Sequence, residues 1–358
     1  MKAILMLEDG KSFFGESPVG SGESVGKVIL NTAVVGYQES MTDPANAGRI
    51  VVFTYPLIGN YGAAPKFNES KKSWARGAVI KEQSRIFSNW QAKGSFNDFA
   101  KENNLPVISG IDTRSLAVHI RQKGEMAGII SSECFEPGDL LAKLNAECKK
   151  QPASLLPDIS VSMKTMPSRE NPKSKRIAVL DLGMTNSMAK QLRDAGFCVT
   201  LFPHDALSAD ILSSKPRGII ISGGPEDDPA LENAARNMHG LPGKIPLLGI
   251  SAGFHVIARA CGAKITKMKL GHHGVNYPVY NPVSHKSEIT VQNHSSVVDP
   301  ESLCRNKDFK ITGYNLNDRT IEEVENKKLK IIGVQYEPAS PGFDEVNPVF
   351  DRFMKYCV

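Results

Sequence analysis

A serine flanked by glycines stands between a short apolar run and a helical pattern. Residues 249–253 read Gly-Ile-Ser-Ala-Gly, which has the G-x-S-x-G spacing of a nucleophile elbow centred on Ser251. Such a turn strains the backbone of the nucleophile and crowds its neighbours, so the flanking positions favour glycine. The helix that follows would offer backbone N–H donors and the positive end of its dipole to a developing oxyanion. The spacing predicts that Ser251 occupies a nucleophile position.

A serine in this position needs a proton acceptor, because its hydroxyl is a poor nucleophile on its own. The chain has eight histidines, and none of them follows His294. His255 comes four residues after Ser251 in the same predicted helix and is expected to face the same side. It is either a base for Ser251 or a hydrogen-bonded side chain of the core, and packing is the simpler interpretation.

The residues that could bind a metal show no ligand spacing. His272 and His273 are adjacent, and adjacent residues of an extended segment point to opposite sides. No third ligand is evident, so no metal site is predicted. The six cysteines are scattered and include no C-x-x-C pair, which fits inert thiols in a reduced, cytoplasmic setting.

The second half of the chain alternates apolar runs with helical patterns. Continuous apolar strands separated by helices predict an α/β fold with a mostly parallel sheet covered by helices on both faces. In such sheets ligands bind at the carboxyl ends of the strands, which is where the Ser251 turn would lie. The expected strands are 177–180, 197–202, 218–221, 246–250 and 329–335, and the expected helices are 188–195, 205–213 and 252–260.

The first half is less regular, with short apolar runs, many turns that contain Gly or Pro, and helices expected only near 97–103 and 113–122. It predicts a strand-rich mixed α/β domain. Between the halves, residues 151–175 contain four prolines and several serines and predict an irregular connection. The expected domains are therefore 1–150 and 176–358, joined by 151–175.

Composition excludes several classes of function. A chain of 358 residues predicts two domains, each able to bury its own core. The formal net charge of +5 comes without a focused basic patch, so binding to nucleic acid is not expected. No apolar run approaches the ~20 residues that cross a bilayer, and the start of the chain lacks a cleavage-site pattern. We therefore expect a cytoplasmic protein without a membrane segment.

Ordered motifs run through both halves. They include Leu-Glu-Asp-Gly at 7–10, Gly-Tyr-Gln-Glu at 36–39, Ile-Asp-Thr-Arg at 111–114, Gly-His-His-Gly at 271–274, Gln-Asn-His at 292–294 and Ala-Ser-Pro-Gly at 339–342. With these motifs the chain resembles, nearly end to end, the small subunit of carbamoyl-phosphate synthase, which is the glutamine amidotransferase component of that enzyme.

The resemblance implies a different role for each domain. The N-terminal domain of the family docks on a large synthetase subunit, and we expect loop motifs such as 36–39 to carry that surface. The C-terminal domain is a class I glutamine amidotransferase, which releases ammonia from glutamine for carbamoyl phosphate in arginine and pyrimidine synthesis. The resemblance implies no cofactor in this chain, since ATP and Mg²⁺ would be bound by the large subunit.

The family's catalytic residues are replaced in this chain. In the family, a cysteine at the elbow, in a G-I-C-x-G-x-Q context, attacks the amide, and a histidine and a glutamate in an H-P-E context activate it. Ser251 stands in the place of that cysteine. The H-P-E context is replaced by a segment one residue short, so Tyr336 or Glu337 occupies the place of the histidine. The glutamate has no clear counterpart.

The substrate-binding positions are altered as well. In the family, backbone N–H groups of an N-G-P-G turn and of the residue after the cysteine bind the oxyanion. Gly224 keeps the first glycine of that turn, but Glu226 replaces the second, which lies against the substrate. Ala252 and His255 stand in place of a leucine and a glutamine, and Ala45 stands in place of a serine. Asn293 is retained. Ser295 and Ser296 stand in place of a glycine and a phenylalanine that close over glutamine in the family.

These substitutions lead to one hypothesis and two alternatives. The hypothesis is a degenerate glutaminase, a small subunit that binds the large subunit as a structural or regulatory partner while ammonia comes from solution. One alternative is a hydrolase that uses Ser251 with His255 or Glu337 as base. The other is a glutaminase retained through a rearranged base near Tyr336. The sequence leaves open whether a large subunit is present, what the altered pocket binds and how the complex assembles.

Overall fold

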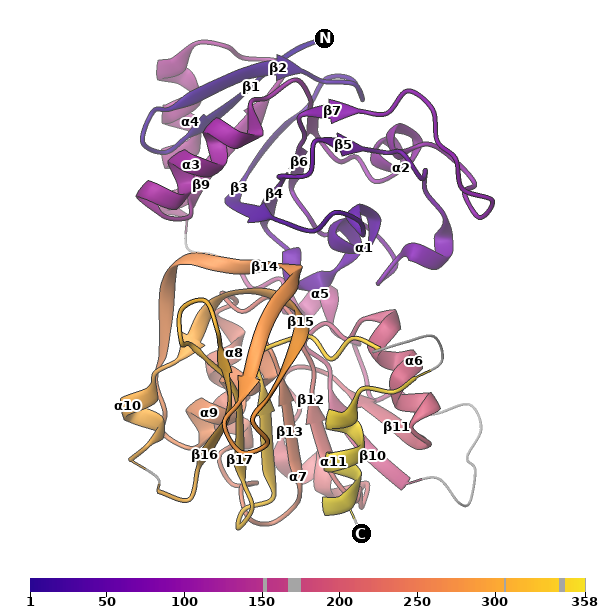
Figure 1. Ribbon diagram of the computed structural model, residues 1–358, viewed down its shortest axis with the longest axis vertical. Coiled ribbons are helices and arrows are strands. Elements are labelled where there is room, and N and C mark those ends of the chain that lie inside the picture. The colour runs from indigo at the N-terminus through magenta and orange to yellow at the C-terminus, as the bar shows by residue number, and fades with distance from the viewer. Residues whose placement is uncertain (151–152, 167–174, 306, 341–344, 358) are drawn as a thin grey trace. The chain divides into compact units, whose positions relative to one another are not determined.

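The computed structural model divides into two compact units (Figure 1). Unit 1 comprises Met1–Pro152 and Lys269–Gly274, and unit 2 comprises Ala153–Met268 and Val275–Val358. Among the described residues, no helix combines the length and the apolar composition needed to cross a bilayer. The structure describes residues 1–150, 153–166, 175–305, 307–340 and 345–357.

Unit 1 is built on a seven-stranded sheet in the order β2-β1-β9-β3-β4-β6-β8. The pairs among β2, β1, β9 and β3 are antiparallel, and those among β3, β4, β6 and β8 are parallel. The expected strand-rich mixed α/β domain is confirmed. Its strands are β1 (Lys2–Leu7), β2 (Ser12–Glu16), β3 (Glu23–Asn31), β4 (Arg49–Phe53), β5 (Leu57–Ile58), β6 (Gly77–Val79), β7 (Glu82–Gln83), β8 (Val107–Ile108) and β9 (Met126–Ser131).

The helices of unit 1 are more numerous than expected. Helices α2 (Phe96–Glu102) and α3 (Thr113–Lys123) match the two predicted helices, but the longest helix of the unit, α4 (Pro137–Lys149), was not predicted. Only Leu140 and Leu144 of α4 are fully buried, where they pack on Ile4 and Met6 of β1. So short an apolar stripe gives little periodic signal, and tertiary packing stabilises the helix. The helices are α1 (Tyr37–Thr42), α2 (Phe96–Glu102), α3 (Thr113–Lys123) and α4 (Pro137–Lys149), with short 3₁₀ turns at Pro44–Asn46 and Pro65–Phe67.

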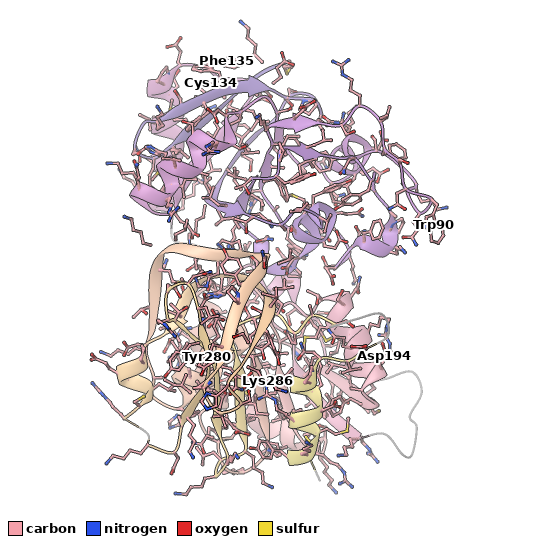
Figure 2. All side chains as sticks on the ribbon, in the orientation of Figure 1. Trp90, Cys134, Phe135, Asp194, Tyr280 and Lys286 are labelled. Carbon is pink, nitrogen blue, oxygen red and sulfur yellow. The ribbon has the colours of Figure 1, made fainter. Side chains whose placement is uncertain are left out.

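The motif at 36–39 braces the fold, so its assignment to a recognition loop was wrong for Tyr37 and Gln38. Both side chains are buried in α1. The Tyr37 ring stacks on Tyr61 with 4.1 Å between centroids, and the Gln38 amide donates to the carbonyl of Ala64 over 2.8 Å. Among the described residues of this unit, exposed apolar side chains lie outside this motif. Trp90 is 90% exposed, and Figure 2 shows it at the edge of the unit.

The segment Lys269–Gly274 of strand β14 (Ile265–Asn281) is held in unit 1 by Glu125. The Glu125 carboxylate accepts from the backbone N–H of Gly271 over 2.7 Å and lies 3.1 Å from His273 Nε2. Lys27 Nζ lies 3.0 Å from its other oxygen. His273 therefore has a structural partner in this unit.

Unit 2 is built on a nine-stranded sheet in the order β11-β10-β12-β13-β18-β17-β16-β14-β15. The first five strands are parallel, while the pairs from β18 to β14 are antiparallel. The predicted α/β architecture with a mostly parallel sheet is confirmed. Besides β14, the strands are β10 (Lys175–Leu180), β11 (Phe197–Phe202), β12 (Ile219–Ile221), β13 (Leu247–Ile250), β15 (Lys286–Val298), β16 (Lys310–Asn315), β17 (Ile321–Asn326) and β18 (Ile331–Val334).

Helices cover both faces of the parallel strands (Figure 1). Ile219 and Ile221 of β12 pack in one apolar cluster with α8 (Ala230–Met238) and α9 (Ala252–Ala260). Ile220 packs in the other cluster with α6 (Asn186–Asp194) and α11 (Pro348–Tyr356). The alternation follows from the period of two residues in a strand. The helices of unit 2 are α5 (Leu156–Ile159), α6 (Asn186–Asp194), α7 (Ser208–Ser213), α8 (Ala230–Met238), α9 (Ala252–Ala260), α10 (Pro300–Leu303) and α11 (Pro348–Tyr356).

The described part of the expected connection 151–175 is not wholly irregular, because it contains helix α5. Asp228 holds the start of this helix. Its carboxylate accepts from Ser154 Oγ and from the backbone N–H of Leu155, both over 2.7 Å. The segment is thus part of unit 2. The parts of this connection outside the described residues are 151–152 and 167–174.

Candidate active site at the Ser251 turn

Ser251 lies between β13 and α9, as predicted for an elbow. Its backbone has φ 51° and ψ −116°, a combination that residues with a side chain rarely adopt. Three hydrogen bonds hold it there. Its N–H donates to Val334 O over 2.8 Å, and its carbonyl accepts from Phe254 N over 2.9 Å and from His255 N over 3.2 Å. The strained geometry of a nucleophile elbow is therefore present.

Close backbone approach explains the glycines around this turn. A Cβ on Gly253 would lie 2.1 Å from the carbonyl oxygen of Ile221 at the end of β12. A Cβ on Gly224, in the turn after β12, would lie 1.9 Å from the carbonyl oxygen of Leu182. Only hydrogen fits at both positions, so the two turns pack tightly against their neighbouring strands.

The hydroxyl of Ser251 has no hydrogen-bonded base among the described residues. Within the described part of the chain, no hydrogen bond to Ser251 Oγ is formed. The side chain is 2% exposed. No described residue is therefore hydrogen-bonded to the hydroxyl as a proton acceptor.

His255 is a core side chain whose Nε2 lies 2.9 Å from Gln335 Oε1. The ring is fully buried, and its Nδ1 has no hydrogen-bond partner among the described residues. Burial lowers the pKa of His255, against the raising effects of the Glu226 charge and the bond to Gln335. The imidazole is therefore neutral and weakly basic, which agrees with the packing interpretation.

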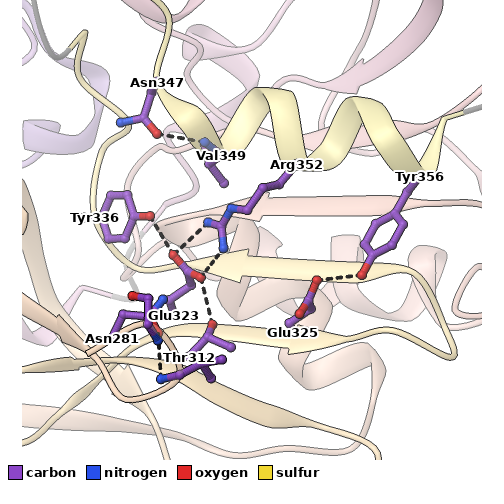
Figure 3. A network of polar contacts seen from close by, with 11 residues as sticks. Asn281, Thr312, Glu323, Glu325, Tyr336, Asn347, Val349, Arg352 and Tyr356 are labelled. Atoms are coloured by element: carbon purple, nitrogen blue, oxygen red, sulfur yellow. Dashed lines mark hydrogen bonds and ion pairs between the residues drawn. The ribbon is translucent and has the colours of Figure 1, made fainter. Parts of the chain in front are cut away.

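Tyr336 belongs to a separate polar network, in which three side chains converge on Glu323 (Figure 3). The Tyr336 hydroxyl donates to Glu323 Oε2 over 2.8 Å, and Arg352 donates to both carboxylate oxygens over 2.6 and 2.9 Å. Thr312 Oγ1 adds a bond of 2.8 Å. Burial and the Glu323 charge raise the pKa of Tyr336 well above its ordinary value, so the phenol keeps its proton.

Glu337 is the sequence-predicted acid that lies against the turn after β12. Its Oε1 is 2.8 Å from the place that a Cβ on Gly223 would take. Its backbone N–H donates to Val291 O over 2.9 Å. The carboxylate is thus beside the residue that precedes Gly224.

Glu226 is buried and bonded to the backbone of β15. Its carboxylate accepts from the N–H of Ser295, and its Oε2 accepts from the N–H of Ser296 over 3.0 Å. Three of the predicted pocket residues, Glu226, Ser295 and Ser296, are therefore brought together. Of the remaining predicted positions, Ala252 is the buried first residue of α9, Asn293 is half-buried in β15, and Ala45 is buried in unit 1 within the 3₁₀ turn Pro44–Asn46.

The polar partners of these residues were not predicted from the sequence. Gln335 bonds to His255, and Glu323 with Arg352 bonds to Tyr336. Both side chains are buried. Gln335 directly follows the apolar strand β18, and a polar residue there was a signal because buried polar groups require hydrogen-bond partners. Glu323 gave no such signal, because its strand β17 reads Ile-Glu-Glu-Val-Glu-Asn and is mostly polar.

Comparisons with known proteins agree across both halves of the chain. The family model for the carbamoyl-phosphate synthase small chain, CPSase domain, matches residues 5–130, and that for glutamine amidotransferase class-I matches residues 178–356. The carbamoyl phosphate synthase small chain of Listeria monocytogenes serovar 1/2a is 38% identical over 355 residues, covering 99% of this chain and 96% of the relative. Those of Akkermansia muciniphila (37% identical, covering 99% and 97%) and Caldanaerobacter subterraneus subsp. tengcongensis (39%, covering 99% and 96%) are similarly close.

Removing the cation of the Glu323 network should destabilise unit 2. In Arg352→Met the buried Glu323 carboxylate loses its charge partner, and we expect the free energy of unfolding to fall by about 3 kcal/mol. This value is near the low end for buried pairs because Arg352 is partly exposed. Urea unfolding at pH 7 measures it. Lys355→Met changes an exposed residue of the same helix and is the control. It should leave the free energy of unfolding nearly unchanged.

The stability lost in Arg352→Met should depend on pH. Burial alone would raise the pKa of Glu323, but the bonds and charge of Arg352, with Thr312 and Tyr336, hold it below its ordinary value. Because the pKa of Glu323 is lower in the folded state than in the unfolded chain, its ionisation stabilises the fold. That stabilisation is present above the unfolded-state pKa of about 4.3 and is lost as pH falls through the folded-state pKa. The difference between wild type and Arg352→Met should therefore be largest at neutral pH and shrink in acid. A difference that is constant with pH would contradict this account.

Relieving the strain at the elbow should stabilise the chain. Ser251→Gly removes a strain of about 1–3 kcal/mol but adds the entropy cost of glycine, about 0.5–1 kcal/mol. We expect Tm to rise by about 2–4 °C. Ser251→Ala, which keeps the strain, should leave Tm nearly unchanged. Thermal unfolding of the three proteins measures this, and a lower Tm for Ser251→Gly than for Ser251→Ala would rule it out.

Proposed function

The chain belongs to the family of carbamoyl-phosphate synthase small chains, and from that premise we propose that it serves as a small subunit that has lost glutamine hydrolysis. The observation that carries the proposal is the Ser251 hydroxyl, which has no hydrogen-bonded base among the described residues. In this account the chain binds a large synthetase subunit as a structural or regulatory partner. Ammonia then comes from solution.

The nucleophile supports this proposal. A free thiol with a pKa of ~8.5 is a few per cent thiolate at neutral pH, which a hydroxyl cannot match. Loss of one member of a catalytic triad already costs about 10⁴–10⁶ in turnover. Here the nucleophile, base and orienting acid of the family pattern are all replaced.

The candidate bases support it as well. Tyr336 keeps its proton, and its hydroxyl donates a hydrogen bond to Glu323. His255 is buried with a lowered pKa, and its Nε2 is bonded to Gln335. A glutaminase retained through a rearranged base would need an imidazole within about 4 Å of Ser251 Oγ. No imidazole of the described residues is hydrogen-bonded there.

The remaining role follows from the family. The large subunit would bind ATP and Mg²⁺ and make carbamoyl phosphate, in the cytoplasm, for arginine and pyrimidine synthesis. Unit 1, which the small-chain family model matches, would carry the docking surface. Because Tyr37 and Gln38 of the motif at 36–39 are buried, exposed side chains such as Trp90 would make the contacts with the large subunit. Tryptophan is frequent among interface anchors.

One observation favours a second candidate, a serine hydrolase. The Glu337 carboxylate lies against Gly223, beside the turn that would form an oxyanion site. A fluorophosphonate probe distinguishes the two functions, because it labels an activated serine and not an inert one. We expect no labelling of the wild type above the Ser251→Ala control. Labelling that Ser251→Ala and Glu337→Gln both abolish would establish the hydrolase instead.

The proposed function predicts which nitrogen source the complex uses. Purified with a large subunit of the family, the chain should support carbamoyl phosphate synthesis from ammonium, while the rate with glutamine should be lower by at least about 10³-fold. Ser251→Cys should not restore the glutamine rate, because the new thiol would have no imidazole to take its proton and Glu226 would remain in the pocket.

The ammonium assay is the internal control, since it shows that the complex is assembled and active. The decisive measurement is release of ammonia from glutamine by both proteins, with and without the large subunit. Turnover within about tenfold of an ordinary kcat of ~10 s⁻¹ would overturn the proposal.

A further inference from the structure

Glu226 is a buried carboxylate held by two consecutive backbone N–H groups. It is 5% exposed, and Ser295 and Ser296 are 1% and 3% exposed. The N–H of Ser295 faces one carboxylate oxygen and that of Ser296 faces the other. An ionised carboxylate can be buried only where such bonds replace water, so this pair of donors is a built anion site.

The arrangement is selective for a carboxylate. Each of the two donors needs its own acceptor at the same time, and the two oxygens of an ionised carboxyl group supply them. An amide in the same place would offer one acceptor and turn an N–H₂ group toward the second donor. The site is therefore matched to the charge and shape of Glu226, not only to its size.

The place of the contact is that of a ligand site. Glu226 lies in the turn after β12, and Ser251 lies in the turn after the neighbouring parallel strand β13. Both turns are at the carboxyl ends of parallel strands, where ligands bind in folds of this type. The contact also joins segments 69 and 70 residues apart, so the side chain reaches across this edge to β15.

We propose that the N–H groups of Ser295 and Ser296 form a site for a small carboxylate, which the chain fills with its own Glu226. The side chain acts as a ligand in cis, closing the site to free carboxylates and bracing the turn after β12 against β15. The inference rests on the proposed function, since a chain that binds glutamine for hydrolysis would need this part of the pocket for its substrate.

Removing the side chain should open the site to acetate. In the full-length protein, Glu226→Ala removes the carboxylate to which the N–H groups of Ser295 and Ser296 donate, so its Tm should fall. Adding sodium acetate should raise that Tm relative to sodium chloride at equal ionic strength, because acetate binds the folded state. Wild type should show no such difference, since its own carboxylate occupies the site.

Two variants separate occupancy from charge. Glu226→Gln still fills the space, so its Tm should fall without an acetate-dependent recovery. Glu232→Ala removes an exposed carboxylate from helix α8 and leaves no buried donors, so acetate should not affect it. If Glu226→Ala does not fold in chloride, the yield of folded protein on refolding in acetate is the readout, and it should exceed the yield in chloride.

Each result decides the inference. Acetate-dependent recovery confined to Glu226→Ala supports it. Equal Tm and equal refolding yield in the two salts, or an acetate effect of the same size in wild type, would overturn it. These outcomes are separate from the proposed function, which fails if the wild-type complex hydrolyses glutamine, whatever acetate does.

Discussion

Helix α9 begins so close to the end of strand β12 that only hydrogen fits on the Cα of residue 253. The Ile221 carbonyl fills the space that a side chain would need. This approach, with the bond from Ser251 N to Val334 O, forces Ser251 into its strained conformation. The elbow thus depends on packing between backbones, which requires nothing of the side chain at residue 251. The backbone of the elbow is for this reason independent of the side chain that residue 251 carries.

The buried polar side chains at the predicted site positions have partners within the protein. Tyr336 donates to Glu323, and His255 pairs with Gln335. Glu226 accepts from the backbone of β15. Each pairing satisfies groups that burial would otherwise penalise. In each of these pairings a polar side chain of unit 2 bonds to a group of the protein itself.

Apolar segments bounded by turn residues were predictable from the sequence. Helix α9 spans the expected 252–260, and strand β11 spans the expected 197–202. Both segments are mostly apolar and mostly buried, so local composition and burial agree. Helix α4 was missed because it buries only two leucines, and its stability comes from β1, far away in sequence. The motif at 36–39 was assigned to a loop because Gly36 marks a turn, yet the residues after it form the buried helix α1.

The sequence alone determined the family, the position of Ser251 at a strand–helix turn, and the lack of any histidine beyond residue 294. These are properties of residue type and order, which no folding event changes. Only the tertiary structure decided where the side chains of Glu226, Tyr336 and His255 point. Their partners come from strands brought alongside by the sheet, and the direction of a side chain depends on the donors and acceptors it meets there. That information lies in contacts between distant segments, so no local pattern contains it.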